Sequence, residues 1–192
     1  MSEVKIANPA PLGLSGFALT TFVLSFANAG WLPGKGDALV VLGLALFYGG
    51  IAQLLAGMWE FRSGNTFGAT AFSSYGAFWL SFAALFLPGL GGAASVVSST
   101  ALGIYLVAWA IVTGILMLAS FRTTGAVAVV FILLFITYIL LAIGALQGNA
   151  TITHYGGYIG ILTAIAAWYA AMAGVITGAS NGKINLPVFP LA

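Results

Sequence analysis

Charged residues are scarce in this chain. Only eight of its 192 residues are Lys, Arg, Asp or Glu, whereas soluble domains are about one quarter charged. Hydrophobic residues make up 61% of the sequence, and the mean hydropathy is +1.13. Such a chain cannot cover its surface with groups that bind water. We therefore expect an integral membrane protein, with membrane lipid as its surroundings.

Cysteine is absent, and histidine occurs once. The sequence therefore excludes disulfides, thiolate metal sites and a site built from several histidines of one chain. A net charge of +2 is too small for a nucleic-acid interface. Catalysis needs convergent titratable groups, which the apolar segments lack away from their ends. We expect no metal, no cofactor, no nucleic-acid partner and no enzymatic activity.

Six apolar segments are long enough to cross a bilayer, which takes about 20 residues in a helix. They are Leu12–Trp31, Ala38–Phe61, Phe67–Leu87, Thr100–Phe121, Ala126–Leu146 and Tyr155–Ala179. The connections are short and rich in Gly and Pro, as is typical between antiparallel neighbours. Only helices and closed barrels satisfy their backbone groups in lipid, and the segments show little alternation. The predicted fold is an all-α, polytopic bundle of six transmembrane helices.

The few charges predict the orientation. Four basic residues fall in the two tails and in the second and fourth loops, namely Lys5, Arg62, Arg122 and Lys183. The opposite side has Lys35 alone. Because cytoplasmic loops are enriched in Lys and Arg, we predict that both termini are cytoplasmic. The predicted organisation is an N-terminal tail (1–11), a membrane domain (12–179) and a C-terminal tail (180–192).

The first predicted span opens with a helix signal. Asn8 is a candidate N-cap, and Pro9 and Pro11 follow it in the first turn, where a helix tolerates proline. An aromatic ring, two hydroxyls and an amide then recur at helical spacing in the stripe Phe17, Thr20, Thr21, Leu24 and Asn28. This stripe indicates either the wall of a pore or threonines that bond to their own helix backbone.

The second predicted span carries an amide and a carboxylate on one face. Gln53 and Glu60 are seven residues apart, which returns to nearly the same side of a helix. A buried amide is costly unless it is paired or faces water, so Gln53 indicates a pore wall or an interhelical hydrogen bond. Glu60 stands at the end of the span near Arg62, where we expect a structural or pH-related role.

The last predicted span carries two pairs of glycines four residues apart, Gly156 with Gly160 and Gly174 with Gly178. Small residues at this spacing let helix backbones approach closely, so this helix is expected to pack tightly. His154 precedes the first pair at the outer edge of the span. Both a structural and a pH-related role are open for it.

Three motifs in order resemble the acetate uptake transporter family, the group of the bacterial succinate–acetate permease and its fungal relatives. They are residues 8–14 (NPAPLGL), 47–53 (FYGGIAQ) and 65–76 (NTFGATAFSSYG), with further matches at 141–144 and 148–150. The resemblance covers nearly the whole chain. It implies a six-helix protomer in a homo-hexameric ring, in which each protomer has its own path for acetate and, in some members, succinate.

The resemblance also implies where the site lies. The family's narrow hydrophobic constriction carries over to Phe17, Tyr75 and Leu134. The expected substrate path is lined by Asn8, Thr20, Gln53, Asn65, Thr66 and Ser74. The predicted function is a permease or channel of the cell membrane for acetate and related short carboxylates, and protonation of the solute is expected to favour flux.

Two other function classes remain open. The family is similar in architecture to proton-gated urea channels, so urea or a short amide is an alternative solute. The other class is a structural membrane protein without a transported solute. The deep position of Gln53 and the polar residues around Tyr75 argue against that class.

Overall fold

The computed structural model describes residues 6–32, 34, 36–87 and 97–191. In this part of the chain the regular elements are helices, and extended pairing is confined to one bridge between Thr124 and Pro190. The long helices are α1 (Ala10–Asn28), α4 (Thr66–Ala84), α5 (Ser99–Ser120), α6 (Gly125–Gln147) and α7 (Ala150–Ala179). The second span is a composite of η1 (Asp37–Leu39), α2 (Val40–Leu46), η2 (Phe47–Ala52) and α3 (Gln53–Ser63). The predicted all-α bundle of six helical units is confirmed.

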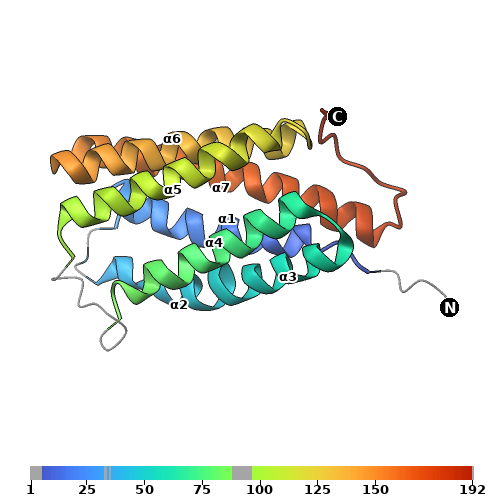
Figure 1. Ribbon diagram of the computed structural model, residues 1–192, viewed down its shortest axis with the longest axis horizontal. Helices are drawn as coiled ribbons and strands as arrows, with labels where there is room; N and C mark the ends of the chain where they lie inside the picture. The colour runs from blue at the N-terminus through green and yellow to red at the C-terminus, as the bar shows by residue number, and fades with distance from the viewer. Residues whose placement is uncertain (1–5, 33, 35, 88–96, 192) are drawn as a thin grey trace.

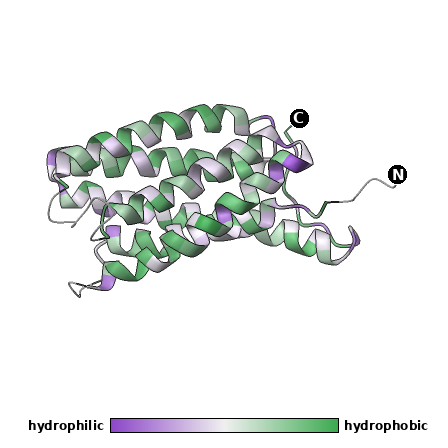
Figure 2. Cartoon of the chain, turned by 60° about the horizontal axis from the view of Figure 1, so that its bottom comes forward, coloured by the Kyte–Doolittle hydropathy of each residue, from purple (hydrophilic) through white to green (hydrophobic). Residues whose placement is uncertain are grey.

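Five of these units are long and apolar enough to cross a membrane, namely α1, the composite span, α5, α6 and α7. The sixth unit, α4, has 19 residues, carries several small polar side chains and packs along α3 in the same bundle. Apolar residues cover the helices along most of their length, and hydrophilic residues gather mainly toward the ends (Figure 2). The chain is a multi-pass membrane protein.

Two groups of helices run side by side in the bundle (Figure 1). In one group α1 packs on α7, α7 on α6 and α6 on α5, and in the other group α3 packs on α4. The composite span and α4 also contact α1, so that α1 is the member of the first group that faces the second. Helix α1 therefore packs against helices of both groups.

Glycines let α7 approach its neighbours. A Cβ atom added at Gly156 would be in close contact with Leu141 of α6. One added at Gly160 would be in close contact with Ser25 of α1, and one added at Gly174 with Pro11 of α1. Gly178 has open space beside it instead. Three of the four glycines singled out by their spacing therefore mediate helix packing.

The second span contains a wide turn that the sequence analysis did not predict. Residues 47–52 form a π-helix, in which the Gln53 N–H donates to the Tyr48 carbonyl five residues back. A Cβ atom on Gly49 would lie 2.9 Å from Cδ1 of Trp79, so the turn packs its backbone against α4. Single π turns inside longer helices occur frequently at functional sites.

The bundle has two distinct ends. We call the end with the first described residues, the α3–α4 and α5–α6 turns and the C-terminal segment the tail end, and the opposite end the loop end (Figure 1). Arg62, Arg122 and Lys183 lie at the tail end, on one side of the bundle as the charge pattern predicts. Lys5 and Lys35, which complete that pattern, lie outside the described residues.

The C-terminal segment turns back across the tail end. The Gly125 N–H donates to the Phe189 carbonyl (2.7 Å), next to the bridge at Thr124. The Tyr169 hydroxyl of α7 donates to the Pro187 carbonyl (2.7 Å). These bonds hold the segment against the start of α6 and the side of α7.

Helix α7 begins five residues before its predicted start. Asn149 caps it, because the Asn149 Oδ1 accepts a hydrogen bond from the Ile152 N–H (3.2 Å). The prediction followed the apolar run, which Thr151 and Thr153 interrupt, although a first helical turn accommodates hydroxyl side chains. His154 therefore lies within the first turns of α7.

Candidate functional site

A cavity of about 580 Å³ occupies the loop-end half of the bundle. It is lined by the second half of α1 and of α4, by α2, by the start of α5 and α7 and by the second half of α6. Because successive helices are antiparallel, all these segments lie at the same end. Two lining residues, Phe17 of α1 and Leu134 of α6, are midway along their helices and mark the inner end of the cavity.

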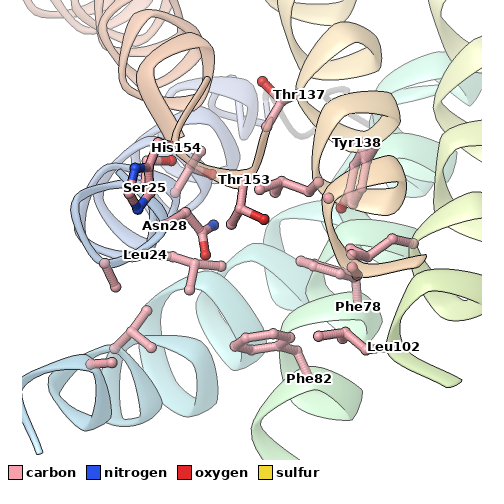
Figure 3. Close-up of a pocket in the computed structure, with 18 of the residues that line it drawn as sticks. Leu24, Ser25, Asn28, Phe78, Phe82, Leu102, Thr137, Tyr138, Thr153 and His154 are labelled. Carbon is pink, nitrogen blue, oxygen red and sulfur yellow. The ribbon is translucent and has the colours of Figure 1, made fainter. Parts of the chain in front are cut away.

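The cavity has a polar side and an apolar side, as Figure 3 shows. The polar side has Ser25 and Asn28 from α1 with Thr153 and His154 from α7, and the apolar side has Phe78 and Phe82 from α4 with Leu102 from α5. A few polar groups among apolar walls are typical of sites for small molecules. This cavity fits a solute with a polar head and a short apolar remainder.

Of the three residues assigned to the constriction, Phe17 and Leu134 line the cavity, and Tyr75 packs against Phe17. Phe17, Tyr75 and Leu134 are buried, with 5%, 2% and 4% of their surface exposed, and they belong to one apolar core. The ring centroids of Phe17 and Tyr75 are 5.7 Å apart. The Tyr75 hydroxyl is hydrogen-bonded to Thr113 Oγ1 at 3.0 Å, so the phenol is tied to α5.

Two buried groups in the cavity wall have no hydrogen-bond partner among the described residues. They are the Thr21 hydroxyl and the Trp79 indole N–H. Buried polar groups in folded proteins are nearly always paired, so two unpaired groups beside a cavity need an explanation such as bound water or a ligand. The indole can only donate, and the hydroxyl can donate or accept.

Two predicted path residues lie beside this wall. The Thr20 hydroxyl donates to the Gly16 carbonyl (2.8 Å), and Thr20 packs against Gly49 of the π-helix. Gln53 is 1% exposed and packs against Gly16, and its Oε1 has no partner in the described part of the chain. Thr20 and Gln53 therefore lie where α1 meets the second span, behind the cavity lining. Ser74 is half-buried on α4.

The other predicted path residues lie at the tail end. Asn8 Oδ1 accepts from the Ala10 N–H (3.0 Å). The predicted cap position was wrong by one residue, because α1 begins at Ala10 and Pro9 is its N-cap. Asn65 caps α4, because its Oδ1 accepts from the Gly68 N–H (3.1 Å). Thr66 is the exposed first residue of α4.

Glu60 is buried at the turn between α3 and α4, with 1% of its surface exposed. Its Oε2 accepts hydrogen bonds from Asn65 Nδ2 (2.8 Å) and Ser63 Oγ (3.3 Å). Its Oε1 has no partner among the described residues. The bonds to Oε2 join the end of α3 to the start of α4 and support a structural role.

His154 is half-buried and lines the cavity. A Cβ atom on Gly30 would lie 2.7 Å from His154 Nε2, so the imidazole packs on the turn that follows α1. That turn depends on Gly30 itself, whose φ is +74°, a conformation that favours glycine. His154 therefore supports this turn and faces the cavity at once.

Sequence reasoning placed Thr21 in the stripe of the first span but left it out of the expected substrate path, and it missed Trp79 as a member of the site. The angle of each residue around the helix axis, measured from Phe17, could have identified Thr21. Thr21, Leu24 and Asn28 follow Phe17 at spacings that keep them within about 40° of it around a helix, whereas Thr20 is turned by about 60° the other way. For Trp79 there was no comparable signal, because a tryptophan in a span also fits simple packing.

The comparisons with known proteins agree with this geometry. The sequence matches the GPR1/FUN34/yaaH family over residues 1–192. The chain belongs to this family. The resemblance drawn from its motifs is confirmed.

Two individual proteins with similar sequences indicate what members of such a family transport. The succinate-acetate/proton symporter SatP of Escherichia coli is 40% identical over 188 residues, covering 98% of both proteins. The ammonia transport outward protein 2 of Saccharomyces cerevisiae is 47% identical over 194 residues, covering 97% of this chain and 67% of the yeast protein.

A solved structure extends the likeness to three dimensions. The structure of the bacterial acetate channel SatP matches with a TM-score of 0.87 at 40% identity, covering 96% of this chain and 99% of that chain. These three similar proteins are named as a symporter, an ammonia transport protein and a channel. The prediction of a membrane transporter that is not an enzyme is confirmed.

Proposed function

We propose that this protein conducts acetate and related short-chain carboxylates, including succinate, across the membrane. The cavity carries this proposal, because it presents polar groups along one wall and ends at a collar of Phe17, Tyr75 and Leu134. The names of the Escherichia coli symporter and of the solved acetate channel supply the solute class.

The collar explains why a proton favours flux. Moving a bare carboxylate between Phe17, Tyr75 and Leu134 is costly, because these side chains offer no cation and the one phenol hydroxyl is engaged with Thr113. A carboxylic acid is neutral below a pKa of roughly 4 to 5, and the neutral acid loses little on leaving water. The solute therefore crosses the collar as the acid and ionises again beyond it.

The remaining site residues take places along this route. Thr21 and Trp79 form a polar station just above the collar, and Asn28 and His154 form the mouth at the loop end. Thr20, Gln53 and Ser74 form the wall behind the collar, and Asn8, Asn65 and Thr66 border the mouth at the tail end. The solute meets a hydrogen-bonding group on each side of the apolar collar.

The same proposal includes the cellular setting. We place the protein in the cell membrane as a homo-hexamer whose protomers each contain a complete path. Residues 12–179 form the membrane domain, and the tails 1–11 and 180–192 are cytoplasmic. The basic residues Arg62, Arg122 and Lys183 at the tail end support this orientation.

Uptake of labelled solutes into proteoliposomes tests the function. Acetate uptake should exceed that of protein-free liposomes and should rise when the outside is made acidic, whereas labelled urea should enter both at the same rate. Phe17→Ala should raise succinate uptake several-fold by widening the collar. Protein-dependent urea uptake without acetate uptake would favour the amide channel instead, and absence of both would favour a structural protein.

A further inference from the structure

Three oxygen atoms are buried without a hydrogen-bond partner along the contact between α3 and α4. They are Oε1 of Gln53, Oε1 of Glu60 and Oγ of Ser73, and their lack of a partner holds for the residues that the structure describes. Each unpaired buried polar atom of this kind needs an explanation, such as bound water or a role in function. We call these three residues the buried row.

The buried row is continuous along the helix contact. Gln53, Gly57 and Glu60 share one face of α3, since they are four and seven residues apart. A Cβ atom on Gly57 would collide with Ser73 Oγ, so the serine hydroxyl of α4 sits level with Gly57, between the two longer side chains. The row is about 10 Å long, at about 1.5 Å per residue of α3.

The two ends of the buried row reach different places. At the inner end, the Cβ of Gln53 lies 3.6 Å from the position of a Cβ on Gly16, the residue that precedes Phe17 of the collar. At the outer end, Glu60 lies in the α3–α4 turn, with its carboxyl carbon 2.8 Å from the position of a Cβ on Gly68. The row therefore joins the tail end of the bundle to the side of the collar.

No charged group balances Glu60 in the part of the chain that the structure describes. Helices α1 and α4, which pack against α3, contain no Asp, Glu, Lys, Arg or His. Their one phenol, Tyr75, bonds to Thr113, and Tyr48 of η2 is about three turns away along the span. Arg62 on α3 is exposed. A buried carboxylate without a cation is costly, whereas the neutral acid is much less so.

We propose that Glu60 is a proton-binding site of the conduit, and that the buried row carries protons between it and the collar. A hydronium ion at the tail end gives its proton to the Glu60 carboxylate, forming the acid and releasing water. The acid then passes a proton through water held by Ser73 and Gln53 to a solute carboxylate beside Phe17, which regenerates the Glu60 carboxylate. This second step rests on the proposed function.

Infrared spectroscopy of the full-length protein in lipid tests the proton site without any flux. The wild type should show the carbonyl band of a protonated carboxylic acid that disappears as the pH is raised. Glu60→Gln keeps a carbonyl that can accept from Asn65 and should lack that band. The control Asp37→Asn, which removes an exposed carboxylate bonded to the Gly34 N–H at the other end, should keep it. A band unchanged in Glu60→Gln, or absent from the wild type at every pH, would overturn the proposal.

Acetate exchange at equal concentrations on both sides, measured against pH, tests the row. Glu60→Gln and Ser73→Ala should both flatten the pH dependence of the exchange, while Asp37→Asn keeps the wild-type profile. A wild-type profile in Ser73→Ala would show that the row is not the route. If the wild type exchanges no acetate but keeps the Glu60 band, the proposed function fails and the proton site stands. If the wild type exchanges acetate but shows no such band, the proton site fails and the proposed function stands.

Discussion

The two ends of this bundle differ in how closely their helices pack. At the tail end, small residues face large neighbours and the helices close: a Cβ on Gly13 would lie 2.6 Å from the Phe72 ring, and one on Gly57 would collide with Ser73. At the loop end, aromatic and hydroxyl residues surround a cavity of about 580 Å³ instead. The collar at Phe17 lies between these two regions.

The difference shows how a chain with few polar groups builds an asymmetric conduit. The tail end pairs or encloses its polar side chains, as Glu60 and Asn65 do in the α3–α4 turn. Among the residues that the structure describes, the Thr21 hydroxyl and the Trp79 indole N–H at the loop end have no hydrogen-bond partner. A buried polar atom without a partner lowers stability in either region, but only the atoms at the loop end belong to residues that line the cavity.

The largest effect is expected from adding a side chain where α7 touches α1 at the loop end. A Cβ on Gly157 would collide with the Ala29 backbone, which cannot move aside as a flexible side chain can. Gly157→Val should therefore abolish the folded protein or lower its thermal midpoint strongly, because overpacking costs about 1–3 kcal/mol or more. Gly178→Val, at the tail end of the same helix in open space, is the matched control. Equal midpoints in detergent would contradict the packing described here.

The next prediction compares Thr21, which lines the cavity, with Thr20, which is packed behind the cavity lining. Thr21→Val removes a hydroxyl that has no partner among the described residues, and it should lower acetate uptake several-fold at unchanged stability. Thr20→Val removes a hydroxyl bonded to the Gly16 carbonyl, and its effect on uptake should be smaller. Uptake by proteoliposomes together with thermal midpoints checks both. The opposite order of effects on uptake would place the solute beside Thr20.

A smaller effect is expected where α4 meets α5 at the collar. Tyr75→Phe and Thr113→Val each leave one buried hydroxyl unpaired and should each cost about 1–2 kcal/mol. The double variant should cost less than the sum, because it leaves no orphaned partner. Unfolding of the four proteins in denaturant measures the cycle. Strict additivity would mean that the 3.0 Å contact contributes nothing.

The smallest effects concern the helix caps at the two ends. Asn149→Ala removes one cap bond at the loop end and should cost about 1 kcal/mol. Asn65→Ala removes the cap of α4 and also the donor to Glu60 Oε2, so it should cost more. Thermal midpoints of the two variants give the order. A larger loss from Asn149→Ala would contradict the assignment of Asn65 to the closed end.

The six spans could be predicted because lipid imposes length and apolarity on each of them. The limits of the second span are within two residues of the prediction, since Asp37 and Ser63 are polar boundaries that composition reveals. The start of α7 was missed because a polar first turn capped by Asn149 does not look apolar. Burial of Glu60 was not foreseen, because a carboxylate near a span end ordinarily faces water.

The site could be predicted only in part. The collar residues came from the resemblance, and the structure brings Phe17, Tyr75 and Leu134 into one core. Thr21 could not be separated from Thr20 by residue type, because the choice depends on the rotation of α1 against its neighbours. Asn65 was assigned to the path by its motif. The structure shows that its Oδ1 caps α4 by accepting from the Gly68 N–H, and that its Nδ2 donates to Glu60 Oε2.

The π-helix at residues 47–52 lets the two halves of the second span, α2 and α3, face different directions. If this turn became an ordinary α-turn with no residue removed, α2 would rotate by about 100° relative to α3. The wide turn therefore lets Val41 line the cavity while Gln53 and Glu60 stay buried in the other half of the span. One extra residue thus sets the orientation of the entrance relative to the closed half of the molecule.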